Sequence, residues 1–183
     1  LQFALGGYDI MLNDISEDRL EHAVGNVKTN LALLQSMGLV DERRADAVPG
    51  RIRTGVSMAE MVGEADFVVE AVFEDLDVKR QVLSQISSAV SPDCLIASNT
   101  SSLLIGDLEE AVTNPNRFIG VHYNNPADMN PVVEVIPGDH TETRYTDAIL
   151  KWMKSTEKLA VKCKDTPCFI LNRQSLPYIN EAS

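Results

Sequence analysis

Short apolar runs alternate with longer amphipathic segments along most of the chain. The longest amphipathic segment, at 17–37, repeats apolar residues three or four positions apart, which predicts a helix. Two further segments of this kind predict helices at 77–90 and at about 142–155. The runs rich in β-branched residues predict strands at 8–13, 65–72, 94–99, 117–122, 132–136 and 159–164.

The order of these segments predicts an α/β fold. Strands that alternate with helices build βαβ units and a mostly parallel sheet. Several of the predicted strands are apolar at nearly every position, which is typical of strands that are covered on both faces. We therefore expect a Rossmann-type sheet with helices on both of its faces.

The stretch YDIMLNDISED at 8–18 is similar to the second strand of a dinucleotide-binding half. In that arrangement an acid at the end of the strand binds the ribose hydroxyls of NAD, and Asp14 is the candidate. The alternative is a helix N-cap, because Asp14 or Ser16 could cap the helix that follows. The residues alone leave both interpretations open.

The glycine-rich phosphate loop of such a half does not occur in the sequence, since Gly6-Gly7 does not fit GxGxxG. That loop lies about 20 residues before the ribose acid, so we expect it, and the first strand of the sheet, to precede Leu1. Residues 1–7 then form the end of the first helix. We interpret the sequence as an incomplete part of a longer protein, cut again within a helical pattern at 176–183.

Composition narrows the classes of partner and compartment. The net charge of −11 disfavours nucleic acid as a partner, because an acidic surface repels phosphates. No apolar run is long enough to span a membrane, and the first residues do not form a signal peptide, so we expect a cytoplasmic protein; the mitochondrial matrix stays open. Cys94, Cys163 and Cys168 are interpreted as reduced, buried thiols, and no metal site is expected.

Candidate chemistry lies in GVHYNNPADMNPVVEVI at 120–136. His122 ends one apolar run, and Glu134 lies inside another twelve residues later. A buried carboxylate is costly unless it is paired, so we expect the two side chains to meet. An imidazole oriented by a carboxylate suits a base that takes a proton from an alcohol. The alternatives are a structural histidine and a strand residue that faces the surface.

Several motifs in a fixed order resemble the L-3-hydroxyacyl-CoA dehydrogenase family, including its 3-hydroxybutyryl-CoA dehydrogenases. They are VVEAVFEDLDVK (68–79), ASNTSSL (97–103), GVHYNNP (120–126), VVEVI (132–136) and KDTPCFILNR (164–173). The resemblance implies an NAD-binding domain at 1–166 and, at 167–183, the beginning of an all-helical domain. That helical domain is implied to form a homodimer interface.

The resemblance also implies roles for individual residues. For catalysis it implies His122 as the base, Glu134 as the acid that orients it, Ser101 near the reacting atoms and Asn172 at the start of the helical domain. Glu74 and Lys79 could equally lie on an exposed loop and helix face, and Ser101 could cap a turn. The implied cofactor-binding residues are Asp14, Glu74, Lys79, Ser101 and Asn125.

The implied reaction is the NAD-dependent interconversion of (S)-3-hydroxyacyl-CoA and 3-oxoacyl-CoA, as in fatty acid β-oxidation. Cys168 stands where the family usually has a glycine, so we expect strain in that turn. Asn30 and Met37 stand where many members bind the phosphates of CoA. A dehydrogenase of a hydroxy acid without CoA is therefore the first alternative. An NAD-binding structural protein of the crystallin type is the second.

Overall fold

A computed structural model describes residues 1–175 of the chain, which fall into two compact units, Leu1–Gly63 and the unit that begins at Glu64. The helical pattern expected at 176–183 lies outside the described residues. Both units combine helices with strands that pair in parallel, so the expected α/β class is confirmed. None of the helices between residues 1 and 175 is long and apolar enough to cross a membrane.

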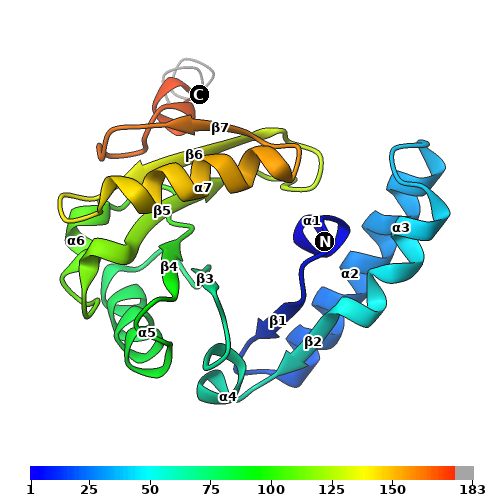
Figure 1. The fold of residues 1–183 in the computed structure, drawn as a ribbon, viewed down its shortest axis with the longest axis horizontal. Helices are drawn as coiled ribbons and strands as arrows, with labels where there is room; N and C mark the ends of the chain where they lie inside the picture. Colours follow the sequence, from blue (N-terminus) through cyan, green and yellow to red (C-terminus); the bar gives the residue numbers. More distant parts are fainter. Residues whose placement is uncertain (176–183) are drawn as a thin grey trace, which may run out of the picture. The chain divides into compact units, whose positions relative to one another are not determined.

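The first unit contains a short two-stranded parallel sheet (Figure 1). Ile10 lies opposite Ile52 in this sheet. Within residues 1–7, only Gln2–Leu5 are helical. Its elements are α1 (Gln2–Leu5), β1 (Ile10–Asn13), α2 (Glu17–Ser36), α3 (Glu42–Ala47), a 3₁₀ turn (Pro49–Arg51), β2 (Ile52–Gly55) and α4 (Met58–Val62).

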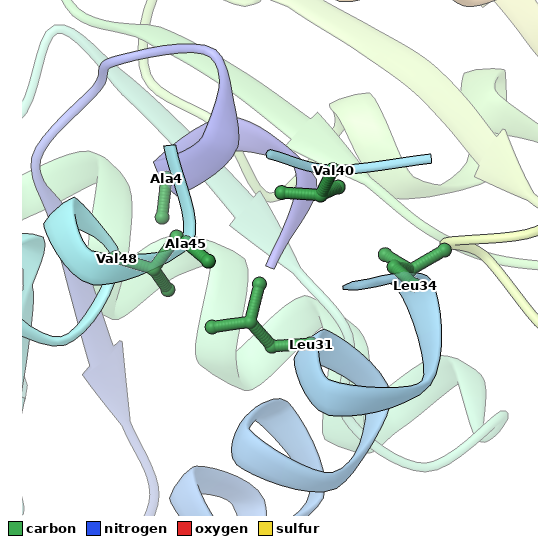
Figure 2. Close-up of a cluster of buried hydrophobic side chains, with 6 residues drawn as sticks. All are labelled: Ala4, Leu31, Leu34, Val40, Ala45 and Val48. Carbon is green, nitrogen blue, oxygen red and sulfur yellow. The ribbon is translucent and has the colours of Figure 1, made fainter. Parts of the chain in front are cut away.

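The core of the first unit forms where the end of α2 meets α1 and α3. The apolar face predicted for α2 supplies two of its side chains, which lie against the neighbouring elements in Figure 2. Burial of this face, and not helix propensity alone, stabilises α2. The buried cluster consists of Ala4, Leu31, Leu34, Val40, Ala45 and Val48.

The second unit contains a five-stranded sheet with the order β3-β4-β5-β6-β7. Its neighbouring strands are parallel except for β5 and β6, which run antiparallel (Figure 1). Its elements are β3 (Phe67–Glu70), α5 (Leu76–Ala89), β4 (Leu95–Ser98), α6 (Ile105–Glu109), a 3₁₀ turn (Pro115–Arg117), β5 (Phe118–Tyr123), β6 (Val132–Pro137), α7 (Thr143–Ser155) and β7 (Leu159–Lys162).

Helices cover both faces of this sheet, as the sequence predicted. A Cβ atom at Gly120 of β5 would lie 2.6 Å from the Cδ1 atom of Ile105, so the glycine allows α6 to approach closely. The Tyr123 hydroxyl of the same strand lies 3.2 Å from the Met153 sulfur of α7. Residues three positions apart on a strand face opposite sides, and α6 and α7 therefore pack on opposite faces.

Candidate active site

The central pair of the candidate site is a cross-strand contact between β5 and β6. Their antiparallel register places His122 directly opposite Glu134, so both side chains lie on the same face of the sheet. The Nδ1 atom of His122 lies 2.7 Å from Oε2 of Glu134, and only 4% and 1% of the two side chains are exposed. The contact that the sequence suggested is present in the structure.

This geometry assigns different tasks to the two ring nitrogens of His122. An ionised carboxylate only accepts hydrogen bonds, so Nδ1 carries the proton that points to Glu134. Nε2 then holds the lone pair and is the nitrogen that can take a proton from a substrate. The ring of Phe169 packs 5.7 Å from the imidazole, measured between ring centroids, and helps to hold its orientation.

The second oxygen of Glu134 binds the main chain of a distant segment. Oε1 accepts hydrogen bonds from the backbone amides of Ile170 (2.8 Å) and Leu171 (3.0 Å), where a helix begins that is described as far as residue 175. The thiol of Cys163 lies 3.7 Å from the same oxygen, and burial together with the charge of Glu134 raises the pKa of this thiol to about 11. Glu134 therefore joins β6 to the segment around 170.

A second carboxylate anchors the beginning of that segment. The two oxygens of Asp165 accept hydrogen bonds from the amides of Ile105 and Gly106, each at 2.9 Å, at the start of α6. Between the two anchors, Cys168 and Phe169 have φ angles of 63° and 49°, in the left-handed region that favours glycine. The strain expected at Cys168 is thus visible in the backbone, at a cost of about 1–3 kcal/mol per residue.

Asn172 links this segment to the turn that follows β4. Its side-chain amide donates a hydrogen bond of 3.1 Å to the carbonyl oxygen of Ser101. Contacts in the structure thus connect the four candidate catalytic residues. Glu134 contacts His122 and binds the amide of Leu171. The next residue along the chain, Asn172, binds Ser101. Whether each of them takes part in catalysis remains a prediction.

Glu74 holds the turn that contains Ser101. One of its oxygens accepts from the hydroxyl of Thr100 (2.6 Å), the hydroxyl of Ser102 (2.9 Å) and the amides of Ser101 and Ser102 (both 2.8 Å). Burial of the carboxylate raises its pKa, but these four hydrogen bonds outweigh burial and lower the pKa of Glu74 to about 2. Glu74 therefore shapes this turn.

We expect Glu74 to make the folded state sensitive to acid. Because its pKa falls from 4.5 to about 2 on folding, its stabilisation is complete above pH 4.5 and is lost as the pH falls towards 2. Urea unfolding at a series of pH values gives the free energy of unfolding as a function of pH. The acid limb of this curve, below pH 4.5, should be flatter for Glu74→Gln than for the unsubstituted protein. Glu64→Gln, at an exposed carboxylate, is the control that should keep the limb. Identical limbs in Glu74→Gln and the unsubstituted protein would refute this role.

Lys79 is completely buried on α5, which rules out an exposed helix face. Its ammonium group lies 2.9 Å from Oε1 of Glu70, 3.1 Å from the carbonyl oxygen of Val72 and 3.5 Å from Oε2 of Glu74. These contacts hold the loop between β3 and α5. Direct contact of Lys79 with a cofactor remains a prediction.

Asn125 lies in the loop 124–131, which joins β5 to β6 and begins two residues after His122. The buried ammonium group of Lys158 fastens this loop by donating hydrogen bonds to the carbonyl oxygens of Ala127 (2.6 Å) and Asn130 (2.5 Å). Burial lowers the pKa of Lys158, since no carboxylate accepts from it in these contacts, although the charge of Asp128 acts in the opposite direction.

Asp14 belongs to the first unit, where it follows β1 directly. The hydroxyl of Ser16 accepts from the amide of Arg19 and is the N-cap of α2, so Ser16 takes the capping role that the sequence had left open between the two residues. Asp14 accepts a hydrogen bond of 3.0 Å from the amide of Ser16. Its carboxylate lies 3.9 Å from the guanidinium group of Arg19.

The sequence interpretation missed two buried charged residues of this region, Glu70 and Lys158, and the half-buried Asp165. Glu70 lies inside an apolar run, which is the same signal that drew attention to Glu134. Lys158 and Asp165 lie in polar surroundings along the chain, so no sequence signal distinguishes them from solvated residues.

Comparison with known proteins identifies the family of the chain. The family model described as "3-hydroxyacyl-CoA dehydrogenase, NAD binding domain" matches residues 1–166. The chain belongs to this family. NAD is the cofactor that the description of the 3-hydroxyacyl-CoA dehydrogenase family model names.

Individual relatives are similar over nearly the whole chain. A 3-hydroxybutyryl-CoA dehydrogenase of Bradyrhizobium diazoefficiens is 35% identical over 179 residues, which are 98% of this chain and 61% of that protein. The solved (S)-3-hydroxybutyryl-CoA dehydrogenase of Ralstonia eutropha superposes with a TM-score of 0.93 at 32% identity, covering 99% of this chain and 64% of that one. A diketoreductase superposes with a TM-score of 0.92 at 26% identity, covering 99% and 65%.

Proposed function

We propose that this chain is the NAD-binding part of an NAD-dependent dehydrogenase that interconverts (S)-3-hydroxyacyl-CoA and 3-oxoacyl-CoA. The buried contact of 2.7 Å between His122 and Glu134, in a chain of this family, is the observation that carries the proposal. The contact lies at the end of β5, and ligands of α/β sheets bind beyond the carboxyl ends of parallel strands.

In the proposed reaction, His122 acts as acid and base. NAD, when bound, would supply the acceptor for the hydride from C3 of the hydroxyacyl substrate. His122 takes the hydroxyl proton on Nε2, because Nδ1 is committed to Glu134. The carboxylate of Glu134 then stabilises the imidazolium that forms, and it holds the ring in one orientation throughout. In the reverse direction, His122 returns the proton to the carbonyl oxygen.

A second candidate function is a dehydrogenase whose hydroxy acid or dicarbonyl substrate lacks CoA. The end of α2 exposes Leu33, Met37 and Leu39, which offer no charge to the phosphates of CoA. The net charge of −11 also opposes a polyanionic substrate. The similar diketoreductase is described as acting on dicarbonyl compounds.

Turnover of NADH separates these possibilities. The full-length protein should reduce acetoacetyl-CoA with a kcat/KM at least about 100-fold higher than that for free acetoacetate, since CoA supplies additional binding energy. The opposite ranking would favour the substrate without CoA. Binding of NADH without turnover of either compound would indicate a structural protein of the crystallin type. Homodimer formation through a helical domain remains a prediction.

Asp14 predicts a preference for NAD over NADP. A carboxylate that binds the ribose hydroxyls repels a 2′-phosphate, so we expect affinity for NAD to exceed that for NADP by more than about tenfold. In Asp14→Ser this repulsion is lost while Arg19, 3.9 Å from the carboxylate, is retained. Calorimetric titration should therefore show a smaller ratio between the two affinities.

Asp9→Ser is the matched control for this substitution. Asp9 is an exposed acid of the first unit that, like Asp14, lies near an arginine, 3.5 Å from Arg51, but it precedes β1 instead of following it. The cofactor ratio should stay unchanged in this variant. Equal affinities of the unsubstituted protein for NAD and NADP would refute the role of Asp14.

A further inference from the structure

A fully buried ion pair lies at the ends of β3 and β4, next to the candidate active site. Glu70 is the last residue of β3 and pairs in register with Ser98, the last residue of β4. Its Oε2 accepts a hydrogen bond of 2.5 Å from the hydroxyl of Ser98, and its Oε1 lies 2.9 Å from the ammonium group of Lys79. No part of either charged side chain is exposed.

The pair holds the main chain of Val72 from both sides. Oε1 of Glu70 accepts a hydrogen bond of 2.6 Å from the amide of Val72, while the ammonium group of Lys79 donates one of 3.1 Å to the carbonyl oxygen of Val72. The backbone amide and the carbonyl oxygen of Val72 are therefore both bound by charged partners, which form stronger hydrogen bonds than neutral ones. Two residues further on, the loop presents Glu74.

A continuous series of contacts leads from this loop to the catalytic pair. Lys79 lies 3.5 Å from Glu74, and Glu74 binds the turn at 100–102 through four hydrogen bonds. The carbonyl oxygen of Ser101 in this turn accepts from Asn172, which follows the amides that Glu134 binds. Glu134 in turn holds His122.

We propose that Glu70 and Lys79 are positioning residues that fix the turn at 100–102 relative to His122. Neither residue needs to touch the substrate, since both act through Val72 and Glu74. A buried ion pair adds little net stability, because the cost of desolvating the two charges offsets much of their attraction. A role in setting geometry accounts for its place at the carboxyl ends of two strands. The expected effect on the KM for NAD rests on the proposed function, whereas the positioning of the turn at 100–102 does not.

Glu70→Gln in the full-length protein is the first test. The substitution keeps the shape of the side chain but leaves the ammonium group of Lys79 with Glu74 as its only carboxylate partner among these contacts. We expect faster amide hydrogen exchange in peptides that cover 71–75 and 98–103. The KM for NAD should rise about tenfold, while kcat should change by less than about threefold because His122 and Glu134 keep their contact.

A double variant separates positioning from the effect of an unpaired buried charge. Glu70→Gln with Lys79→Met removes both charges, which should restore thermal stability, as the removal of a complete buried pair often does. The clamp on Val72 is still lost, so exchange at 71–75 and 98–103 and the KM for NAD should stay raised. If amide exchange at 71–75 and 98–103 and the KM for NAD both returned to the values of the unsubstituted protein in the double variant, the proposal would be overturned.

Glu109→Gln is the matched control, because Glu109 is a buried carboxylate of the same unit that pairs with His140 at 2.8 Å. The Glu109→Gln variant should alter neither amide exchange at 71–75 and 98–103 nor the KM for NAD. Unchanged exchange at 98–103 in Glu70→Gln would also overturn the proposal, whether or not the protein turns over acetoacetyl-CoA. Faster exchange in a protein without dehydrogenase activity would support the positioning role and refute the proposed function alone.

Discussion

Replacement of His122 by alanine should lower kcat for a 3-hydroxyacyl substrate by about 1,000-fold and leave the affinity for NAD within about twofold. The substitution removes the Nε2 atom that takes the hydroxyl proton. It changes none of the residues that are implied to bind the cofactor. Steady-state kinetics with calorimetric titration of NAD in the same variant separates the two effects.

The chain provides a matched control for this loss in His140. Its Nδ1 atom also pairs with a buried carboxylate, at 2.8 Å from Oε1 of Glu109, but 68% of its side chain is exposed. His140→Ala should therefore keep kcat within about twofold, because removal of an exposed partner leaves the catalytic pair intact. A near-normal kcat in His122→Ala, or equal losses in the two variants, would exclude His122 as the base.

The contact between His122 and Glu134 could be predicted because His122 ends one apolar run and Glu134 lies inside another, and both runs predict strands. A buried acid requires a partner, and His122 ends the preceding apolar run. The antiparallel register that brings them together was not predicted. The short connection at 124–131 indicates it in retrospect, since a parallel pair needs a crossover of a dozen or more residues.

The strand β2 was missed for a local reason. Ile52–Gly55 contains an arginine, a threonine and a glycine, with a single large apolar residue. Neither a continuous apolar run nor a strict alternation marks it, and its pairing with β1 stabilises it instead. Strand propensity depends strongly on such tertiary context.

The anchoring charges show a different limit of sequence reasoning. Lys79 could be interpreted as a cofactor ligand or as an exposed residue; its complete burial excludes the second, and its contacts with Glu70 and Val72 were not predicted. Asp165 binds amides about 60 residues earlier in the chain. Partners at such separations follow from the topology of the sheet, and no local pattern of charge or hydrophobicity encodes them.

Glu134→Gln should lower kcat by about 100-fold or more, although the new side chain has the same shape. Oε1 of Glu134 accepts from the amides of Ile170 and Leu171, so the glutamine must place its carbonyl oxygen there. Its NH₂ group then faces Nδ1 of His122 and donates to it. That arrangement stabilises the tautomer whose proton lies on Nε2, where the base needs its lone pair.

The loss of charge at Glu134 should also weaken the attachment of the segment around 170. Its two amides exchange a charged acceptor for a neutral one, which should lower the free energy of unfolding by about 1–3 kcal/mol. Urea unfolding measures this effect independently of turnover. Asp165→Asn is the matched control, because Asp165 also accepts two amides but does not contact His122 in the described hydrogen bonds. It should reduce stability without a comparable fall in kcat.

The double variant of His122→Ala and Glu134→Gln decides whether the two residues act as one unit. If Glu134 serves catalysis only by orienting and charging His122, its substitution cannot matter further once the imidazole is gone. The double variant should then have a kcat within about threefold of that of His122→Ala alone. Independent contributions would instead multiply, and the double variant would lose about another 100-fold. Multiplied losses would show that the contact of 2.7 Å between the two side chains is structural and not catalytic.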